Sequence, residues 1–245
     1  MKIKMLTLAI AATLMSLGAT DEEIKHVIRN AAEAFDNSEA VEFGRQCALR
    51  KANYDTNRFS RLMQEIALSG TGRVERVMIQ DIGRFGNTNN LPFLYSCVTN
   101  PIFANLAIIS TFKIEGVTTN SVNKLIQYLT FPEEGDQPTI FDDRANRCGW
   151  IMEEHNIMPS QPNHRYLLDT LIGFAASTNW AYAWVLDECI IRHDPVYRYS
   201  KRRLAALQAS SHFEISNSTA HELQRNYVTN AINELIAYPE ANLND

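Results

Sequence analysis

The chain has 245 residues, of which 45% are hydrophobic and 21% charged, and it contains 10 glycines, 8 prolines and 4 cysteines. This composition excludes collagen-like, low-complexity and disulfide-dense miniature proteins. The formal net charge of −5 disfavours general affinity for nucleic acid, whose phosphates attract basic surfaces.

The N-terminus has the order of charges and side-chain sizes that is typical of a secretory signal peptide. Two lysines precede an apolar run over residues 5–17, which is too short for a bilayer span of about 20 residues. Ser16 and Gly18 place small residues at positions −3 and −1 of a cut after Gly18, and cuts after Ala19 or Thr20 are the alternatives. A buried N-terminal helix of a cytosolic protein is the competing interpretation.

We therefore expect a signal peptide at residues 1–20 and a single domain at residues 21–245, in an exported protein that is periplasmic or secreted. Loss of the two leader lysines leaves 21 basic and 28 acidic side chains, a formal charge of −7. Charges interrupt the later apolar stretches within about 15 residues, so no membrane span is expected.

Helical spacing of apolar residues extends along nearly the whole chain, and no stretch shows the period-two alternation of strands. The predicted fold class is therefore all-α. Asp21 is expected to cap the first helix, and Gly86 to end the fourth. The expected helices lie near residues 24–35, 38–47, 59–66, 74–85, 91–98, 102–112, 122–129, 139–155, 166–174, 180–192, 196–207 and 219–237.

Two neighbouring segments match each other at an offset of 30 residues. Residues 61–86 align with residues 91–116 without a gap. In this alignment Gly86 matches Gly116, and most apolar positions coincide. Each segment reads as a short helix, a tight corner and a second helix. Stacked helical hairpins give this pattern because one hairpin cannot bury its apolar face alone.

The junction between the two segments resembles that of the short HEAT repeats in phycobilisome-lyase-like proteins. Ile82-Gly83-Arg84-Phe85-Gly86 has the aliphatic-Gly-x-aliphatic-Gly form that ends a hairpin in that family, and Leu91-Pro92-Phe93-Leu94 has the form that opens the next. Asn100-Pro101 stands where the family usually places Asp-Pro. The second junction departs from the pattern, because Lys113-Ile114-Glu115-Gly116 lacks the first glycine.

The resemblance is clearest over residues 59–129, and the predicted repeat region runs over residues 59–131. It implies an α-solenoid of stacked helical hairpins. Residues 139–237 are expected to form degenerate repeats or a less regular helical cap. A non-repetitive helical domain is the alternative.

The four cysteines, Cys47, Cys97, Cys148 and Cys189, permit two disulfides in three connectivities in an oxidising compartment. Alternation of hairpins between two layers would place Cys148 and Cys189 on second-layer helices of successive hairpins, so this disulfide is favoured. Cys47 and Cys97 would lie in different layers, beyond the Cα separation of about 4.4–6.8 Å that a disulfide needs. Buried free thiols are the alternative for all four.

No catalytic, metal-binding or cofactor-binding motif is complete, so no catalytic residue, metal or cofactor is expected. His221 begins a zincin-like helix, but Arg225 stands where the second histidine ligand is required. A competing hypothesis, an exported helical hydrolase acting on cell-envelope material, would use His193, Asp194 or Glu154.

The leading hypothesis is a non-enzymatic, exported HEAT-type protein that binds another protein, and a toxin-neutralising immunity protein is a further alternative. The candidate contacts are two tryptophans one helical turn apart and the only basic cluster of the acidic chain. A buried aromatic core and a solvated helix start are the competing interpretations. The predicted binding residues are Trp180, Trp184, Tyr197, Arg198, Tyr199, Lys201, Arg202 and Arg203.

Overall fold

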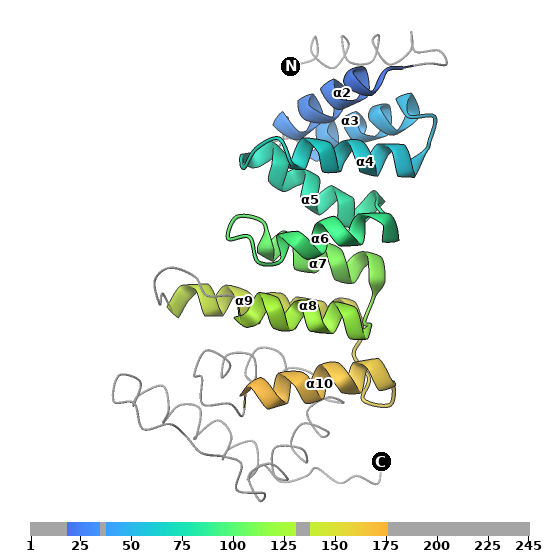
Figure 1. Cartoon of the computed structure of the whole chain (residues 1–245). Helices are drawn as coiled ribbons and strands as arrows, with labels where there is room; N and C mark the ends of the chain where they lie inside the picture. The colour runs from blue at the N-terminus through green and yellow to red at the C-terminus, as the bar shows by residue number, and fades with distance from the viewer. Residues whose placement is uncertain (1–18, 35–37, 131–137, 176–245) are drawn as a thin grey trace, which may run out of the picture. The chain divides into compact units, whose positions relative to one another are not determined.

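The structure is a computed structural model that describes residues 19–34, 38–130 and 138–175 (Figure 1). Every regular element in these ranges is a helix, which confirms the all-α prediction for the described part of the chain. None of the described helices combines the length and the apolar character that a membrane crossing requires. The three helices predicted after residue 175 lie outside the described residues.

The helix bounds agree closely with the sequence pattern. The chain divides into two compact units. Among the described residues, the first unit comprises residues 19–34, 38–116 and 124–130, and the second comprises residues 117–123 and 138–175. The elements are α2 (Asp21–Glu33), α3 (Ser38–Lys51), α4 (Thr56–Ala67), α5 (Arg73–Phe85), the 3-10 helix η1 (Thr88–Asn90), α6 (Leu91–Cys97), α7 (Ala104–Glu115), α8 (Thr119–Thr130), α9 (Pro138–Glu154) and α10 (Pro162–Ala175).

A capping box starts α2, and its cap is Thr20. The Thr20 hydroxyl accepts a hydrogen bond from the Glu23 backbone N–H, while the Glu23 carboxylate accepts one from the Thr20 backbone N–H at 2.8 Å. The prediction of Asp21 as the cap is therefore wrong. Asp21 is the first helical residue, and its carboxylate instead accepts hydrogen bonds from Arg58 and Arg61 of α4.

Three helix pairs and residues 124–130 of α8 build the described part of the first unit. Helices α2 and α3, α4 and α5, and α6 and α7 pack against each other along the chain. Successive pairs are joined because α2 also packs on α4 and α5, and α5 packs on α7. The largest fully buried side chains of the unit are Ile24, Phe59, Leu62, Met63, Ile66, Met78, Ile79, Ile82, Leu94, Ile108, Phe112 and Tyr128.

The offset of 30 residues reappears in the helix ends. Helix α4 ends at Ala67 and α6 at Cys97, whereas α5 ends at Phe85 and α7 at Glu115. A glycine follows α5 and another follows α7, and the two positions favour glycine for different reasons. Gly116 has a φ of 71°, a backbone conformation that would be strained for any residue with a Cβ atom. Gly86 has ordinary φ, but a Cβ there would lie 2.4 Å from the Ile82 carbonyl oxygen.

The described core of the second unit lies along α9 and α10. Its buried side chains include Ile151, Leu167 and Leu171. The Nδ1 atom of His164 accepts a hydrogen bond from the Met158 backbone N–H at 3.0 Å. Burial lowers the pKa of His164, which favours the neutral ring that can accept this bond.

The cysteines of the described part are buried free thiols. Cys47, Cys97 and Cys148 are in no disulfide with one another. Burial raises the pKa of the Cys47 and Cys97 thiols, which makes them weak nucleophiles. Cys148 is a free thiol in this structure, so the favoured disulfide to Cys189 is not seen, and Cys189 itself lies outside the described residues.

Candidate functional site

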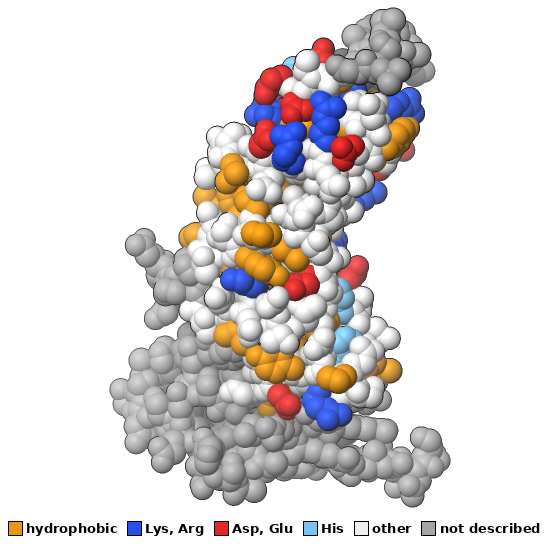
Figure 2. Space-filling view, turned by 45° about the vertical axis from the view of Figure 1, so that its right-hand side comes forward, with side chains coloured by type: hydrophobic (Ala, Val, Ile, Leu, Met, Phe, Trp, Pro, Cys, Tyr) orange, Lys and Arg blue, Asp and Glu red, His pale blue; other side chains and the backbone are white. Residues whose placement is uncertain are grey.

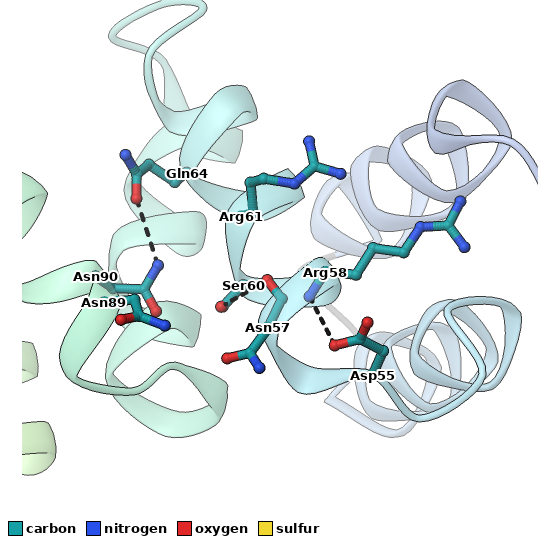
Figure 3. Close-up of a pocket in the computed structure, with 8 residues that line it drawn as sticks. All are labelled: Asp55, Asn57, Arg58, Ser60, Arg61, Gln64, Asn89 and Asn90. Carbon is teal, nitrogen blue, oxygen red and sulfur yellow. Dashed lines mark hydrogen bonds between the residues drawn. The ribbon is translucent and has the colours of Figure 1, made fainter.

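A pocket lined by polar and charged residues lies between α4 and the 3-10 helix η1, in the first unit (Figure 3). Its volume is about 550 Å³. Two successive helical hairpins supply its walls, and each lining residue is polar or charged. The lining residues are Asp55, Asn57, Arg58, Ser60, Arg61, Gln64, Asn89 and Asn90.

Local turn chemistry positions both walls. Asp55 caps α4, because its Oδ1 atom accepts a hydrogen bond from the Arg58 backbone N–H at 3.0 Å. Asn87 caps η1 in the same manner: its Oδ1 atom accepts from the Asn89 backbone N–H at 2.9 Å. In return, the Asn87 backbone N–H donates to Oδ1 of Asn90 at 3.1 Å. The two caps fix the start of each helix and therefore the backbone positions of the amide residues that line the pocket.

Two hydrogen bonds between amide side chains join the walls. The Nδ2 atom of Asn87 donates to Oδ1 of Asn57, its equivalent 30 residues earlier. The Nδ2 atom of Asn90, a buried residue, donates to Oε1 of Gln64 at 3.4 Å. Within the described residues, Nδ2 of Asn57, Nε2 of Gln64 and the side-chain amide of Asn89 have no hydrogen-bond partner. These three amides are groups that a ligand can use, together with the Asp55 carboxylate that also lines the pocket.

The two arginines of the pocket are already occupied by an ion-pair network with α2. The Asp21 carboxylate lies between them, at 2.8 Å from Nε of Arg58 and 2.7 Å from Nη2 of Arg61. Arg61 also pairs with Glu65, and Lys25 of α2 reaches Glu65 at 2.6 Å. Figure 3 shows both guanidinium groups directed away from Asn57 and Asn90. The pocket therefore offers neutral amides and the Asp55 carboxylate, whereas its two guanidinium groups are paired.

This network makes the stability of the first unit sensitive to acid. Hydrogen bonds from Arg61 and Arg58 lower the pKa of Asp21 below its ordinary 3.8, and Lys25 lowers that of Glu65 below 4.5. A lowered pKa in the folded state stabilises the fold above the ordinary value, and this stabilisation is lost as the pH falls through the lowered value. Figure 2 shows basic and acidic side chains interleaved over this part of the molecule.

We expect Asp21→Asn to lower the free energy of unfolding at pH 7 and to reduce its decline between about pH 5 and pH 3. Denaturant titrations of both proteins at pH 7, 4.5 and 3 measure this difference. Glu39→Gln, at an exposed carboxylate in the first turn of α3, is the matched control. Equal pH dependence of all three proteins would contradict a role for the network.

Of the residues that the sequence singled out for binding or catalysis, the structure describes only Glu154. Glu154 is exposed at the end of α9, beside His155, whose pKa burial lowers. No group of histidine, cysteine, aspartate and glutamate side chains in the described part could hold a metal ion. The remaining candidates lie outside the described residues: Trp180, Trp184, His193, Asp194, Tyr197, Arg198, Tyr199, Lys201, Arg202, Arg203 and His221.

Sequence reasoning missed the amide pocket. The available signal was the recurrence of asparagine at positions 57 and 87, at the same offset that relates the two hairpins. A second signal was the run Asn87-Thr88-Asn89-Asn90, which is rich in capping residues. Neither signal identifies a pocket until the hairpins are packed.

Comparison with protein-family models, with curated proteins and with solved structures finds no match to this chain. Its function is therefore inferred from the geometry of the pocket and from the sequence.

Proposed function

We propose that this chain is an exported HEAT-type repeat protein, an α-solenoid of stacked hairpins, that binds an extended segment of another protein and carries out no chemistry on it. The observation that carries the proposal is the amide pocket between equivalent positions of two successive hairpins. Export is proposed from the signal-peptide pattern of residues 1–20.

The repeat part of the proposal is supported by the recurrence of helix ends, terminal glycines and Asn57/Asn87 at one offset of 30 residues. It is also supported by the packing of α5 on α7, which joins the second helices of two successive hairpins. Stacking of this kind exposes a continuous face, on which side chains recur at regular intervals.

The ligand class follows from the groups that the pocket leaves free. An extended polypeptide presents alternating N–H donors and C=O acceptors, and a side-chain amide can satisfy both. The amide donors of Asn57 and Gln64 suit backbone carbonyl oxygens, and Asn89 offers a donor and an acceptor. An apolar anchor for the face of an amphipathic helix is missing from the lining, which disfavours that kind of ligand.

Capture with paired variants tests the proposal. The tagged mature chain is used to recover partners from its native compartment, and each recovered protein is quantified by mass spectrometry. The double variant Gln64→Ala/Asn89→Ala is expected to reduce recovery of the partner at least tenfold, because each lost hydrogen bond weakens binding by about 1 kcal/mol.

Gln80→Ala is the matched control, since Gln80 is an exposed glutamine on α5 that does not line the pocket. It should leave recovery unchanged. Absence of any stable protein partner would contradict the proposed function, and equal recovery with the double variant and with Gln80→Ala would contradict the pocket as the binding site.

A further inference from the structure

We infer that the extended segment held by the amide pocket carries a lysine or arginine side chain, which pairs with the Asp55 carboxylate at the start of α4 and contacts the ring of Tyr54. This inference rests on the proposed function and adds to it the charge of the partner. The amides of the pocket hold the backbone of the segment, whereas Asp55 and Tyr54 select one of its side chains.

The Asp55 carboxylate has room for a cationic donor. Asp55 lines the pocket and is exposed. Its Oδ1 atom accepts the capping hydrogen bond from the Arg58 backbone N–H at 3.0 Å, and the described residues place no other hydrogen bond or ion pair on this carboxylate. Figure 3 shows the Arg58 side chain directed away from Asp55. Because an ionised carboxylate has about four acceptor sites, Asp55 can cap α4 and bind a cation together.

The other charges at the pocket balance each other. Arg58 and Arg61 both pair with Asp21, and Arg61 also pairs with Glu65. The third cation of this network, on α2, has a further carboxylate partner. Within the described residues, Asp55 therefore gives the pocket a net negative charge. Such a charge favours a basic side chain and disfavours an acidic one, since like charges brought together cost free energy.

Tyr54 places an aromatic residue next to this carboxylate. It directly precedes Asp55 in the chain and is 62% exposed. The face of a tyrosine ring attracts a lysine ammonium or an arginine guanidinium. Neighbouring residues have Cα atoms about 3.8 Å apart, so one long basic side chain can contact both Tyr54 and Asp55.

The backbone at Tyr54 adopts a conformation that the end of α3 does not require. A Schellman motif ends this helix, because the Tyr54 N–H donates to the Leu49 carbonyl oxygen and the Asn53 N–H to that of Arg50, each at 2.9 Å. The motif needs a left-handed residue at Asn53, where φ is 56°, but not at Tyr54, where φ is 58°. A bulky residue in this region is strained, and such strain is typical of binding sites. Binding accounts for a strained tyrosine that stays largely exposed.

The dimensions of the pocket set the length of the segment. Its walls run from Asp55 before α4 to Asn89 in η1, on two successive hairpins. Packed helices lie about 8–10 Å apart, a distance that an extended chain crosses in about three residues. The basic residue therefore lies about three residues from the part of the backbone that meets Asn89, and a nonapeptide covers both walls in either direction.

Binding of acetylated and amidated nonapeptides tests the inference. Each peptide set has one fixed central residue, which is lysine, arginine, glutamine, norleucine or glutamate, and mixed uncharged residues elsewhere. The purified full-length chain is titrated with each labelled set by fluorescence anisotropy in about 50 mM salt, where screening is weak. The lysine and arginine sets are expected to bind about three- to tenfold more tightly than the glutamine and norleucine sets, and the glutamate set most weakly.

Two variants separate the charge from the fold. Asp55→Asn removes the charge but keeps the cap, because asparagine and aspartate cap helices about equally well. It is expected to reduce the preference for lysine over glutamine to less than about twofold, with unchanged affinity for the glutamine set. Glu39→Gln, at an exposed carboxylate that does not line the pocket, is the matched control and should keep the full preference.

The variant Tyr54→Gly tests the aromatic residue. Glycine adopts a positive φ without strain, so this change is expected to keep or raise the melting temperature while it lowers the preference for lysine about twofold. A lower melting temperature with an unchanged preference would assign Tyr54 to the fold and contradict its role in binding.

The remaining outcomes distinguish the inference from the proposed function. Equal binding of all sets, or a full preference in Asp55→Asn, overturns the basic side chain. If Gln64→Ala/Asn89→Ala still weakens every set in that case, the proposed binding of an extended segment stands. Binding of none of the sets contradicts the proposed function as well.

Discussion

Replacement of Arg45 by methionine is expected to lower the free energy of unfolding by about 3–5 kcal/mol, because the Asp81 carboxylate would remain buried without its partner. Arg45 of α3 donates two hydrogen bonds to Asp81 of α5, from Nε to Oδ2 at 2.7 Å and from Nη2 to Oδ1 at 2.6 Å. The Asp81 side chain is only 4% exposed in the folded protein, so its carboxylate is largely desolvated and depends on this guanidinium.

The loss should depend on pH in a defined direction. Burial raises the pKa of Asp81 above its ordinary 3.8, while the hydrogen bonds and charge of Arg45 act in the opposite direction. Without Arg45 the folded-state pKa rises further. A raised pKa destabilises the fold at high pH, and the penalty disappears as the carboxyl becomes protonated, so the deficit of Arg45→Met should shrink between pH 7 and pH 4.

Two further variants make the measurement specific. Arg84→Met breaks the exposed pair with Glu42, in which the side chains are 53% and 36% exposed, and is expected to cost less than about 1 kcal/mol. Arg45→Met/Asp81→Leu replaces the buried pair by apolar side chains and should regain most of the lost stability. Denaturant unfolding at both pH values provides the numbers. Equal losses for Arg45→Met and Arg84→Met would contradict the buried pair.

The positions of most described helices could be predicted because their signals are local. The corner at Asn100-Pro101 and the terminal Gly86 act within a few residues of the helices they bound. The cap of α2 shows how far this reasoning extends. Thr20 and Asp21 are both good capping residues. Two interactions decide between them: the Glu23 carboxylate bonds back to the Thr20 backbone N–H, and the arginines of α4 bind the Asp21 carboxylate.

The pocket and the buried ion pair could not be predicted, because both join residues that are distant in sequence. Arg45 and Asp81 are 36 residues apart, and nothing near either residue selects the other. Asn57 meets Asn87 only once two hairpins stack at the right spacing. Periodicity predicts that hairpins exist, whereas tertiary packing determines which polar side chains meet.

Spacing between the two hairpins is set by a close helix approach, which makes Gly83→Ala the second large expected effect. A Cβ at Gly83 of α5 would lie 2.5 Å from Oγ, 2.7 Å from Cβ and 2.8 Å from Cα of Ser110 on α7. The last of these is a backbone atom, so the helices themselves must move apart. Ser110 also donates to the Ile79 carbonyl oxygen at 2.9 Å, and that bond would stretch.

We expect Gly83→Ala to lower the free energy of unfolding by about 2–3 kcal/mol, although alanine is intrinsically the better helix former by about 1 kcal/mol. Gly173→Ala is the matched control on α10, where a Cβ meets no atom of the described residues within 4 Å, and it should leave stability unchanged or raise it by up to about 1 kcal/mol. Denaturant unfolding of both variants measures the contrast.

Ser110→Gly in the Gly83→Ala background separates overpacking from other causes. It relieves the clash of the new methyl group with the serine side chain but not the clash with the backbone of α7. It should therefore recover part of the loss, even though it also deletes the bond to Ile79. No recovery, or a loss in Gly173→Ala equal to that in Gly83→Ala, would contradict the close approach.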